Sequence, residues 1–346
     1  MQLLLAVLIV SFLTISLLLV PFINFLYKIK FQRQKQITKD IFEVKTPIFD
    51  RLHSWKTGTP VGGGFLVIFV VSVLSFMLLS FRLFTGAKIS SVYPLEKEIF
   101  ILFFTFLAFG ILGLYDDLRK TFKLAKHDFW GLRFRYKFLI QWVLAGLIAS
   151  FLYFPWGLNI HIINIRFLDV FDVGILFIPF AAFVIVAFAN AVNITDGLDG
   201  LASGLLLICF FAFLPIAQQF LDTPLSVFIG LWIGAMLGFL YFNIYPARIW
   251  LGDVGTMSFG ATLALIGLLL GKTLGLTIIG SIFVIEAASS LLQLLSKKFR
   301  KKKLFEVAPL HLYFQNKGWE EPKIVMRFWL AGVLAAIIGL LLALPR

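Results

Sequence analysis

Long apolar runs alternate with short polar segments along almost the whole chain. A membrane-spanning helix needs about 17–25 mostly apolar residues. Segments of this kind, some slightly shorter, lie at residues 3–26, 61–81, 99–115, 138–156, 173–191, 200–220, 225–245, 256–271, 274–295 and 327–344. Gly271 and Lys272 separate the eighth segment from the ninth. The pattern predicts an all-α integral membrane protein with about ten transmembrane helices, in one polytopic domain over residues 1–346.

Three local features refine this picture. Residues 160–165 are rich in isoleucine, which predicts a small strand or hairpin between the fourth and fifth spans. Cys209 is the single cysteine and lies inside an apolar run, so we expect a small buried side chain without an internal disulfide. The first apolar run lacks a preceding basic segment and a small-residue cleavage site, which favours a retained span over a removed signal peptide.

The composition agrees with a membrane protein. Hydrophobic residues make up 60% of the chain, the mean hydropathy is +0.96, and only 14% of residues are charged. Soluble domains carry roughly 25% charged residues, so a soluble protein is excluded. The formal net charge is +13, which in a soluble protein would suggest a nucleic-acid partner. Here the excess is better explained by basic cytoplasmic loops, and we expect no nucleic acid.

The positions of the basic residues indicate the orientation in the membrane. When successive loops are assigned to alternating sides, 25 of the 31 Lys and Arg residues fall on one side. Basic loops remain in the cytoplasm, so both termini are predicted to lie outside the plasma (inner) membrane. The same assignment brings Asp residues from three separate loops to the cytoplasmic face, where we expect an active-site cleft.

The segment from Asn190 to Gly200 carries the densest group of polar residues beside an apolar span. If the helix continues through it, the spacing of three places Asn193, Asp196 and Asp199 on one helix face. Carboxylates next to a hydrocarbon span are costly unless they have a partner or a function. The alternative is a helix cap followed by a turn, where Asn and Asp are common.

Two other loops carry carboxylates. Asp116 and Asp117 are adjacent at the end of a span, so on a helix one is expected to face a site and the other a partner such as Lys120. Such a pair is tolerable when a divalent cation or a basic group lies between its members. Lys137 could contact a phosphate or only lipid headgroups. Asp253 lies in a third, glycine-rich loop.

A further loop combines Lys56 and Thr59 with a glycine cluster at a helix start. Side-chain charge and backbone N–H groups in such a loop can bind an anion, although by itself the signal is weak and the alternative is a flexible entry to the second span. Trp250 could stack on a base or simply lie in the interfacial aromatic belt. Several carboxylates without a cluster of His or Cys favour Mg²⁺, completed by water and substrate phosphate, over zinc. The combination indicates phosphoryl chemistry.

Motifs in family order along nearly the whole chain resemble the polyprenyl-phosphate N-acetylhexosamine-1-phosphate transferase superfamily. The nearest branch is the phospho-N-acetylmuramoyl-pentapeptide transferases. The matching pieces are residues 56–60 (Lys-Thr-Gly-Thr-Pro), 116–117 (Asp-Asp), 190–202 (Asn-Ala-Val-Asn-Ile-Thr-Asp-Gly-Leu-Asp-Gly-Leu-Ala), 251–255 (Leu-Gly-Asp-Val-Gly), 308–311 (Ala-Pro-Leu-His), 317–322 (Lys-Gly-Trp-Glu-Glu-Pro) and 327–329 (Arg-Phe-Trp). One departure is clear: the branch usually has three consecutive histidines where this chain has His311, Leu312 and Tyr313.

The resemblance implies a homodimer whose subunits have ten transmembrane helices, the ninth of them broken or bent. It also implies an Mg²⁺-dependent reaction, in which phospho-N-acetylmuramoyl-pentapeptide is transferred from its UDP-activated form to undecaprenyl phosphate and UMP is released. It implies catalytic roles for Asp116, Asp117 and Asp253, and Mg²⁺ ligation by Asp253 and Asp196. Glu286 also matches a family position. The residues expected to bind substrates are Lys56, Thr59, Lys120, Lys137, Asn190, Asn193, Asp196, Asp199, Trp250, Gln293 and His311.

Two alternatives stay open at this point. Leu312 and Tyr313 leave room for another donor, such as UDP-N-acetylglucosamine, within the same superfamily. From a different class, a polyanion transporter could also combine interrupted helices with charged residues. Against a transporter, the carboxylates gather at one membrane face and not at the midplane, and the spans show no obvious paired halves.

Overall fold

The computed structural model describes residues 2–32, 47–53, 56–84, 89–122, 134–165 and 169–344. The helices are α1 (Gln2–Lys28), α2 (Pro47–His53), α3 (Gly63–Phe84), α4 (Leu95–Phe122), α5 (Phe134–Tyr153), α6 (Phe177–Thr195), α7 (Leu201–Gln219), α8 (Thr223–Asn243), α9 (Gly252–Leu269), α10 (Thr273–Ile279), α11 (Ser281–Leu295), α12 (Leu310–Asn316) and α13 (Glu321–Ala343). Two short helical turns, η2 (Gly174–Leu176) and η3 (Ser296–Arg300), and two strands, β1 (Ile162–Ile165) and β2 (Asp169–Asp172), complete the described elements.

The all-α membrane architecture expected from the sequence is confirmed. Among the described residues, nine helices are long and apolar enough to cross a membrane, and the pair α10 and α11 would make a tenth span if counted as one. That pair corresponds to the expected ninth span, 274–295, but it is bent by 77° at Gly280. The apolar pattern does not reveal the bend because both halves are apolar, whereas a Gly–Ser pair such as 280–281 is a common kink position.

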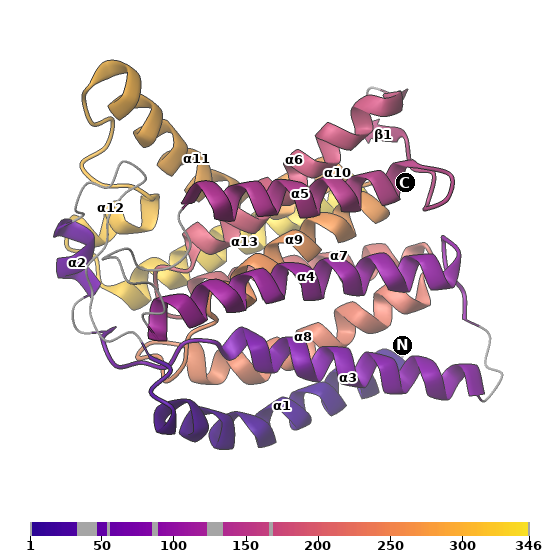
Figure 1. Ribbon diagram of the computed structural model, residues 1–346, viewed down its shortest axis with the longest axis horizontal. Helices are drawn as coiled ribbons and strands as arrows, with labels where there is room; N and C mark the ends of the chain where they lie inside the picture. The colour runs from indigo at the N-terminus through magenta and orange to yellow at the C-terminus, as the bar shows by residue number, and fades with distance from the viewer. Residues whose placement is uncertain are drawn as a thin grey trace.

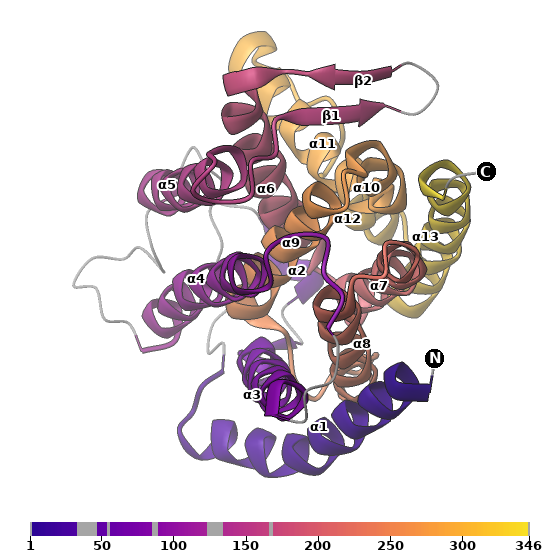
Figure 2. The same ribbon diagram turned by 90° about the vertical axis from the view of Figure 1, so that its right-hand side faces the viewer.

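The bundle is arranged around α9. This helix packs against α4 and α6 on two sides and also contacts α3 and α7, and in Figure 2 it lies near the centre of the helices seen end-on. In the apolar segment of α9, 89% of the residues are buried inside the protein, compared with 22% in that of α1. Both chain termini lie at one end of the bundle, and α2 and α12 lie at the opposite end (Figure 1).

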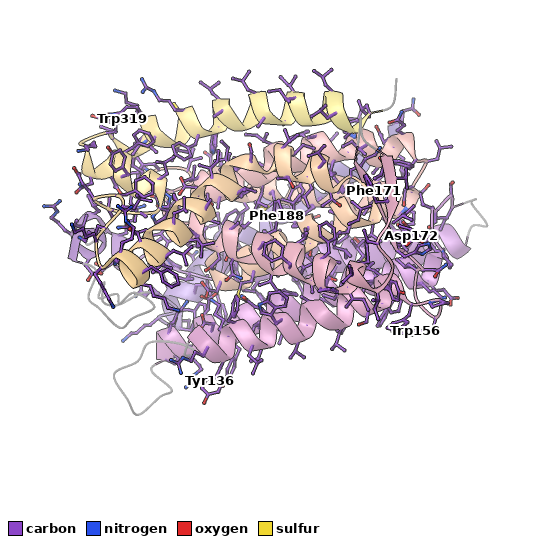
Figure 3. All side chains as sticks on the ribbon, turned by 90° about the horizontal axis from the view of Figure 1, so that it is seen from above. Tyr136, Trp156, Phe171, Asp172, Phe188 and Trp319 are labelled. Atoms are coloured by element: carbon purple, nitrogen blue, oxygen red, sulfur yellow. The ribbon has the colours of Figure 1, made fainter. Side chains whose placement is uncertain are left out.

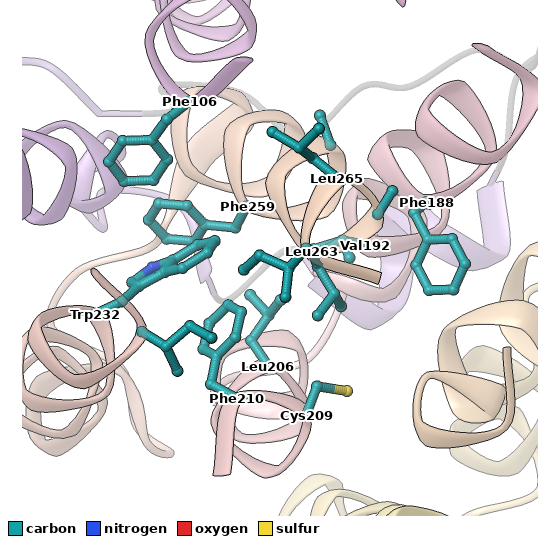
Figure 4. Packing of buried hydrophobic residues seen from close by; sticks show 14 of the residues in the cluster. Phe106, Phe188, Val192, Leu206, Cys209, Phe210, Trp232, Phe259, Leu263 and Leu265 are labelled. Atoms are coloured by element: carbon teal, nitrogen blue, oxygen red, sulfur yellow. The ribbon is translucent and has the colours of Figure 1, made fainter. Parts of the chain in front are cut away.

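Large aromatic side chains fill the centre of the core. Trp232 of α8 is fully buried, with its ring centroid 3.9 Å from that of Phe210 and 5.2 Å from that of Phe106 (Figure 4). Phe259 of α9 completes the contact at 5.0 Å. Cys209 is a free, buried cysteine beside them, as expected. This packing holds α9 in place, and α9 carries a site residue at its first turn.

The predicted hairpin is also confirmed. Strands β1 and β2 pair antiparallel, with Ile162 opposite Asp172 and Ile165 opposite Asp169. Figure 3 shows Phe171 and Asp172 of the hairpin near Trp156 at one end of the molecule, and Tyr136 and Trp319 at the other. Tyr136 and Trp156 are 58% and 60% exposed, which is typical of aromatic residues at the two membrane–water interfaces.

Candidate active site

Four helix ends meet at the end of the bundle that lies opposite the termini. They are the last turn of α4, the first turn of α5, the last turn of α6 and the first turn of α9. We name the residues that they bring together the lysine–aspartate cluster: Asp116, Lys120, Lys137, Asn193 and Asp253. The separate loops of the sequence therefore do converge, as the orientation analysis predicted.

Two lysines from different helices bridge two aspartates in this cluster. The Lys120 Nζ lies 2.9 Å from the Asp116 Oδ2 and 2.8 Å from the Asp253 Oδ2. The Lys137 Nζ lies 2.9 Å from the same oxygen of Asp116 and also pairs with the Oδ2 of Asp253. Asn193 donates from Nδ2 to the Asp253 Oδ1 at 3.0 Å. Both carboxylates are thus held by cationic or amide donors.

The cluster opens to solvent through its lysines. The side chain of Asp116 is 2% exposed, those of Lys137 and Asp253 are 14% exposed, and that of Lys120 is 30% exposed. The aspartates therefore lie at the buried side of the lysine–aspartate cluster, and the lysine ammonium groups lie at its solvent-accessible side. An anion arriving from solvent would meet the lysines first.

Asp117 points away from its neighbour Asp116. Its Oδ2 accepts a hydrogen bond from the backbone N–H of Val254 at 3.0 Å, so it caps the first turn of α9. Gly252 adopts φ +74°, and a Cβ there would lie 2.6 Å from the same oxygen. The expectation that adjacent carboxylates face different ways is confirmed, but Lys120 pairs with Asp116, while the partner of Asp117 is the backbone of α9.

Of the two possibilities left open by the sequence for Asp196 and Asp199, a continuing helix or a turn, the structure has the turn. Helix α6 ends at Thr195, and a turn leads to Gly200 at φ +79° before α7 begins. Left-handed backbone of this kind interrupts a helix, and glycine adopts it easily. The two carboxylates consequently do not share a helix face, and Asp199 enters a different cluster.

Asp196 remains electrostatically coupled to the lysine–aspartate cluster. Burial, and after it the negative charge of Asp253, raises the pKa of Asp196 to about 7. The contribution of Asp253 has the sign expected for two neighbouring carboxylates, each of which disfavours ionisation of the other. Among the described residues, no group of three or more His, Cys, Asp or Glu could enclose a metal ion. A two-carboxylate arrangement suits Mg²⁺, because that ion typically completes its shell with water and substrate phosphate.

A second group, which we name the Lys56 cluster, consists of Lys56, Asp199, Trp250 and Glu321. The Lys56 Nζ lies 2.8 Å from the Asp199 Oδ1 and 2.5 Å from the Glu321 Oε1. Glu321 also accepts the backbone N–H of Asp199 at 2.6 Å, and Asp199 accepts from Trp250 Nε1 at 3.2 Å and from the backbone of Ala247 at 2.9 Å.

The Lys56 cluster joins segments that are far apart in the chain. It ties the loop before α3, the turn between α6 and α7, the loop before α9 and the start of α13. The Lys56 and Glu321 side chains are only 2% and 4% exposed. The charge of Lys56 is already matched by two carboxylates, so it is less suited to binding a phosphate than the sequence suggested. Thr59 lies in the same turn, half-buried, with its N–H bonded to the Lys56 carbonyl at 3.4 Å.

Glu286 and His311 form a buried pair beside the turn. Glu286 accepts the backbone N–H of His311 at 3.0 Å through Oε1 and faces its ring Nδ1 at 3.0 Å through Oε2. The two side chains are 0% and 1% exposed. On the other side of the ring, a Cβ built on Gly197 would lie 2.2 Å from Nε2. Glu286 therefore fixes the imidazole against the turn that carries Asp196.

Two predicted substrate-binding residues bond to other parts of the protein. Asn190 donates from Nδ2 to Gln141 Oε1 and to the Val186 carbonyl, both at 2.8 Å, which ties α6 to α5. Gln293 bonds to the backbone of Leu304 and Phe305, so it holds the chain that follows α11. Their predicted roles in binding substrate stay predictions, and each side chain has a structural partner.

Sequence reasoning missed Glu321 and Gln141. Glu321 lies in the motif at 317–322, but the adjacent Glu320 and Glu321 look equivalent in the sequence. The signal that distinguishes them is Pro322, since proline favours the first turn of a helix and so places Glu321 where α13 begins. No local signal marks Gln141, because its partner lies 49 residues away.

Comparison with known proteins shows the family of the chain. The model of the glycosyl transferase family 4 matches residues 99–271, which contain all of the lysine–aspartate cluster. The phospho-N-acetylmuramoyl-pentapeptide-transferase of Thermodesulfovibrio yellowstonii is 37% identical over 84% of this chain and 81% of its own length. Those of Bacillus pumilus and Rickettsia canadensis are 36% and 37% identical, over 98% and 83% of this chain and 97% and 80% of their own lengths. The chain therefore belongs to the phospho-N-acetylmuramoyl-pentapeptide-transferase family of multi-pass membrane enzymes.

Proposed function

We propose that this protein transfers phospho-N-acetylmuramoyl-pentapeptide from its UDP-activated form to undecaprenyl phosphate, giving a lipid-linked peptidoglycan precursor and UMP. The observation that carries the proposal is the lysine–aspartate cluster, with two partly exposed ammonium groups over two aspartates at one end of a membrane bundle. Both substrates are phosphates, and one of them is a lipid. The names of the relatives point to the same reaction.

The lysines can exchange one anionic partner for another. Lys120 and Lys137 pair with Asp116 and Asp253, and an incoming phosphate would take over part of these contacts. In the reaction they would offset charge on the diphosphate as the bond to the UMP leaving group lengthens. Asp116 is buried and bonded to both ammonium groups, so it would keep them in place. Asp117 would act through α9, whose first turn it caps.

A strong general base is not required for the attack. A phosphate monoester has a second pKa of about 6, so the acceptor is already largely ionised at neutral pH. Orientation of the acceptor oxygen towards the phosphorus that it attacks would supply much of the rate. This makes Asp116 a positioning carboxylate and leaves proton transfer a minor part of its role.

Mg²⁺ fits the residues that the turn and α9 present. Asp196 and Asp253 repel each other, and a divalent cation between them would remove that repulsion. When bound, the ion would supply charge neutralisation and polarise the phosphoryl oxygens. Asn193 would orient the Asp253 carboxylate towards it, and His311, fixed by Glu286, would help to bind the donor beside the same turn.

The same proposal includes the membrane orientation. Both termini lie at the end opposite the cluster, and the Lys and Arg residues are concentrated on the cluster side, which supports a site on the cytoplasmic face of the plasma membrane. Both substrates would then reach the site from the cytoplasm and the inner leaflet. The family resemblance also suggests a homodimer, which crosslinking in membranes would test.

The experiment is UMP release by the purified full-length protein in detergent. The assay contains undecaprenyl phosphate, UDP-N-acetylmuramoyl-pentapeptide and Mg²⁺, with EDTA in a parallel reaction. We expect release only when both substrates and the metal are present. Folded protein that releases no UMP under these conditions would overturn the proposed reaction, and release that EDTA leaves unchanged would remove Mg²⁺ from it.

The donor sugar is tested by competition. Leu312 replaces a histidine of the family pattern, but its side chain is buried at 2% exposure and packs inside the protein. We therefore expect the muramoyl-pentapeptide donor to be preferred despite the replacement. Equal use of UDP-N-acetylglucosamine in a mixture of both donors would contradict that assignment.

A further inference from the structure

The chain that follows α11 carries a group of basic residues at an unusual place. In Figure 1, α11 leaves the bundle sideways, and its far end lies at the same end of the molecule as α2 and α12. We name residues 296–305, which begin with η3, the tip segment. It contains Lys297, Lys298, Arg300, Lys301, Lys302 and Lys303, and no acidic residue.

The tip segment is folded into a defined turn. Gln293 accepts the backbone N–H groups of Leu304 and Phe305, both at 2.9 Å, and donates to the carbonyl of Phe305 at 2.9 Å. Ser296 donates its hydroxyl to the carbonyl of Lys302 at 2.9 Å. Lys301 lies at φ +57°, where the chain reverses. The basic side chains therefore project from a fixed scaffold.

Among the described residues, no carboxylate neutralises five of the six basic side chains of the tip segment. Lys298, Arg300, Lys301, Lys302 and Lys303 are exposed, and none of them pairs with a described carboxylate. The nearest acidic residue in the sequence, Glu306, binds Lys317 at 2.8 Å instead. That contact lowers the pKa of Glu306, so the carboxylate stays ionised and remains paired with Lys317.

Apolar side chains accompany the basic ones. Leu291, Leu292 and Leu295 on α11 are 56%, 49% and 40% exposed, and Phe299 within the tip segment is 73% exposed. An apolar stripe that ends in basic residues is typical of a helix lying at the membrane interface. Because α11 leaves the bundle sideways, its far end lies away from the other spans, at the same end of the molecule as α2 and α12 (Figure 1).

We propose that the tip segment binds the headgroups of anionic phospholipids in the surrounding membrane, with Phe299 inserted at the interface. Charge complementarity selects the partner, since the exposed lysines and arginine match phosphate groups that carry no compensating amine. The sideways position selects a membrane surface over a soluble anion. Binding would hold α11 at the interface and is separate from the reaction proposed for the lysine–aspartate cluster.

Native mass spectrometry of the full-length protein tests this. The probes are dioleoyl phosphatidylglycerol and dioleoyl phosphatidylcholine, added to protein in detergent. We expect the wild-type protein to bind phosphatidylglycerol more tightly than phosphatidylcholine. The variant Lys301→Gln/Lys302→Gln should bind phosphatidylglycerol at least about fivefold more weakly than the wild-type protein, since a single lysine near an anionic surface already contributes about that much. Neither substitution touches the Gln293 contacts, because these reach the chain at residues 304 and 305.

A matched control variant removes two other basic residues. Lys28 and Lys30 are exposed at the same end of the bundle, and Lys30 has φ +56°, like Lys301. We expect Lys28→Gln/Lys30→Gln to change the affinity for phosphatidylglycerol by less than about twofold. In the wild-type protein, we expect the preference for phosphatidylglycerol to be weaker in 500 mM than in 100 mM ammonium acetate, because salt screens the attraction. Equal losses in both variants, or a preference that salt leaves unchanged, would overturn the proposal. So would a Lys301→Gln/Lys302→Gln variant that binds undecaprenyl phosphate less tightly but keeps its phosphatidylglycerol affinity.

Discussion

The lysine–aspartate cluster and the Lys56 cluster use the same chemical groups at the same end of the bundle, but in opposite surroundings. In the first, Lys120 and Lys137 are 30% and 14% exposed, and an incoming phosphate can reach them. In the second, Lys56 is 2% exposed, and its charge is matched by Asp199 and Glu321. The comparison teaches that burial decides whether a lysine is available for a substrate or committed to the fold.

The physical reason is desolvation. A buried ion pair is strongly destabilised when one partner is removed, because the remaining charge has neither water nor a counter-ion. When Lys120 is removed, Asp116 and Asp253 keep Lys137 as a counter-ion, so this loss leaves the fold largely intact. The same substitution should therefore act on stability in one cluster and on activity in the other.

The largest expected effect is on stability and falls in the Lys56 cluster. Lys56→Gln leaves Asp199 and Glu321 without their shared cation, and we expect a loss of about 3–5 kcal/mol in the free energy of unfolding. Thermal unfolding in detergent checks this. The matched control is Lys120→Gln, which is expected to cost less than about 1 kcal/mol. Similar losses in the two variants would remove the distinction between the clusters.

A large effect on rate is expected for Asp253→Asn. The change removes the charge that faces both lysines and the proposed metal ion while keeping the shape of the side chain. Turnover should fall at least about 10²-fold, the lower end of what one catalytic electrostatic group supplies. Steady-state UMP release measures it, and a near-normal rate would exclude Asp253 from the reacting centre.

A smaller effect is expected for Glu286→Gln. The variant keeps one acceptor for the His311 backbone but loses the charged hydrogen bond to the imidazole, a contact of about 1.5–3 kcal/mol. Turnover at donor concentrations below saturation should fall about tenfold, through weaker UDP-sugar binding, if the ring loses the orientation in which it would bind the donor. Gly197→Ala, which would place a Cβ 2.2 Å from the imidazole, should act in the same direction. Wild-type turnover in both variants would show that the orientation of His311 is irrelevant.

The smallest effect is expected for Tyr313→Phe. Tyr313 stands where the family pattern has a histidine, and its hydroxyl makes no hydrogen bond to another described residue. Its ring packs edge-on against Phe314 at 5.8 Å, and phenylalanine keeps that contact. A surface substitution of this kind usually changes stability by less than about 0.5 kcal/mol. We expect an unchanged ratio of turnover between the two donors, and a shift towards UDP-N-acetylglucosamine would reveal a role of the hydroxyl in donor choice.

Sequence reasoning predicted the spans, the hairpin and the convergence of three Asp-bearing loops, because long apolar runs and charge alternation are local signals. It could not decide between a continuing helix and a turn after Thr195, because the polar segment from Asn190 to Gly200 is compatible with both, whereas the structure has a turn with left-handed backbone at Gly200. It also could not predict that the side chains of Lys56, Asn190 and Gln293 bond to other residues of this chain. Those partners lie 265, 49 and 12 residues away, and one-dimensional spacing carries no record of such contacts.

The central claim is that the exposed cluster performs the chemistry and the buried cluster supports the fold. The most direct measurement compares UMP release by Lys120→Gln and Lys56→Gln, each divided by the folded fraction found by size-exclusion chromatography. We expect the rate per folded molecule to fall at least about tenfold more in Lys120→Gln than in Lys56→Gln, since only Lys120 is placed to contact phosphate. A greater loss per folded molecule in Lys56→Gln would contradict the claim and assign the chemistry to the Lys56 cluster.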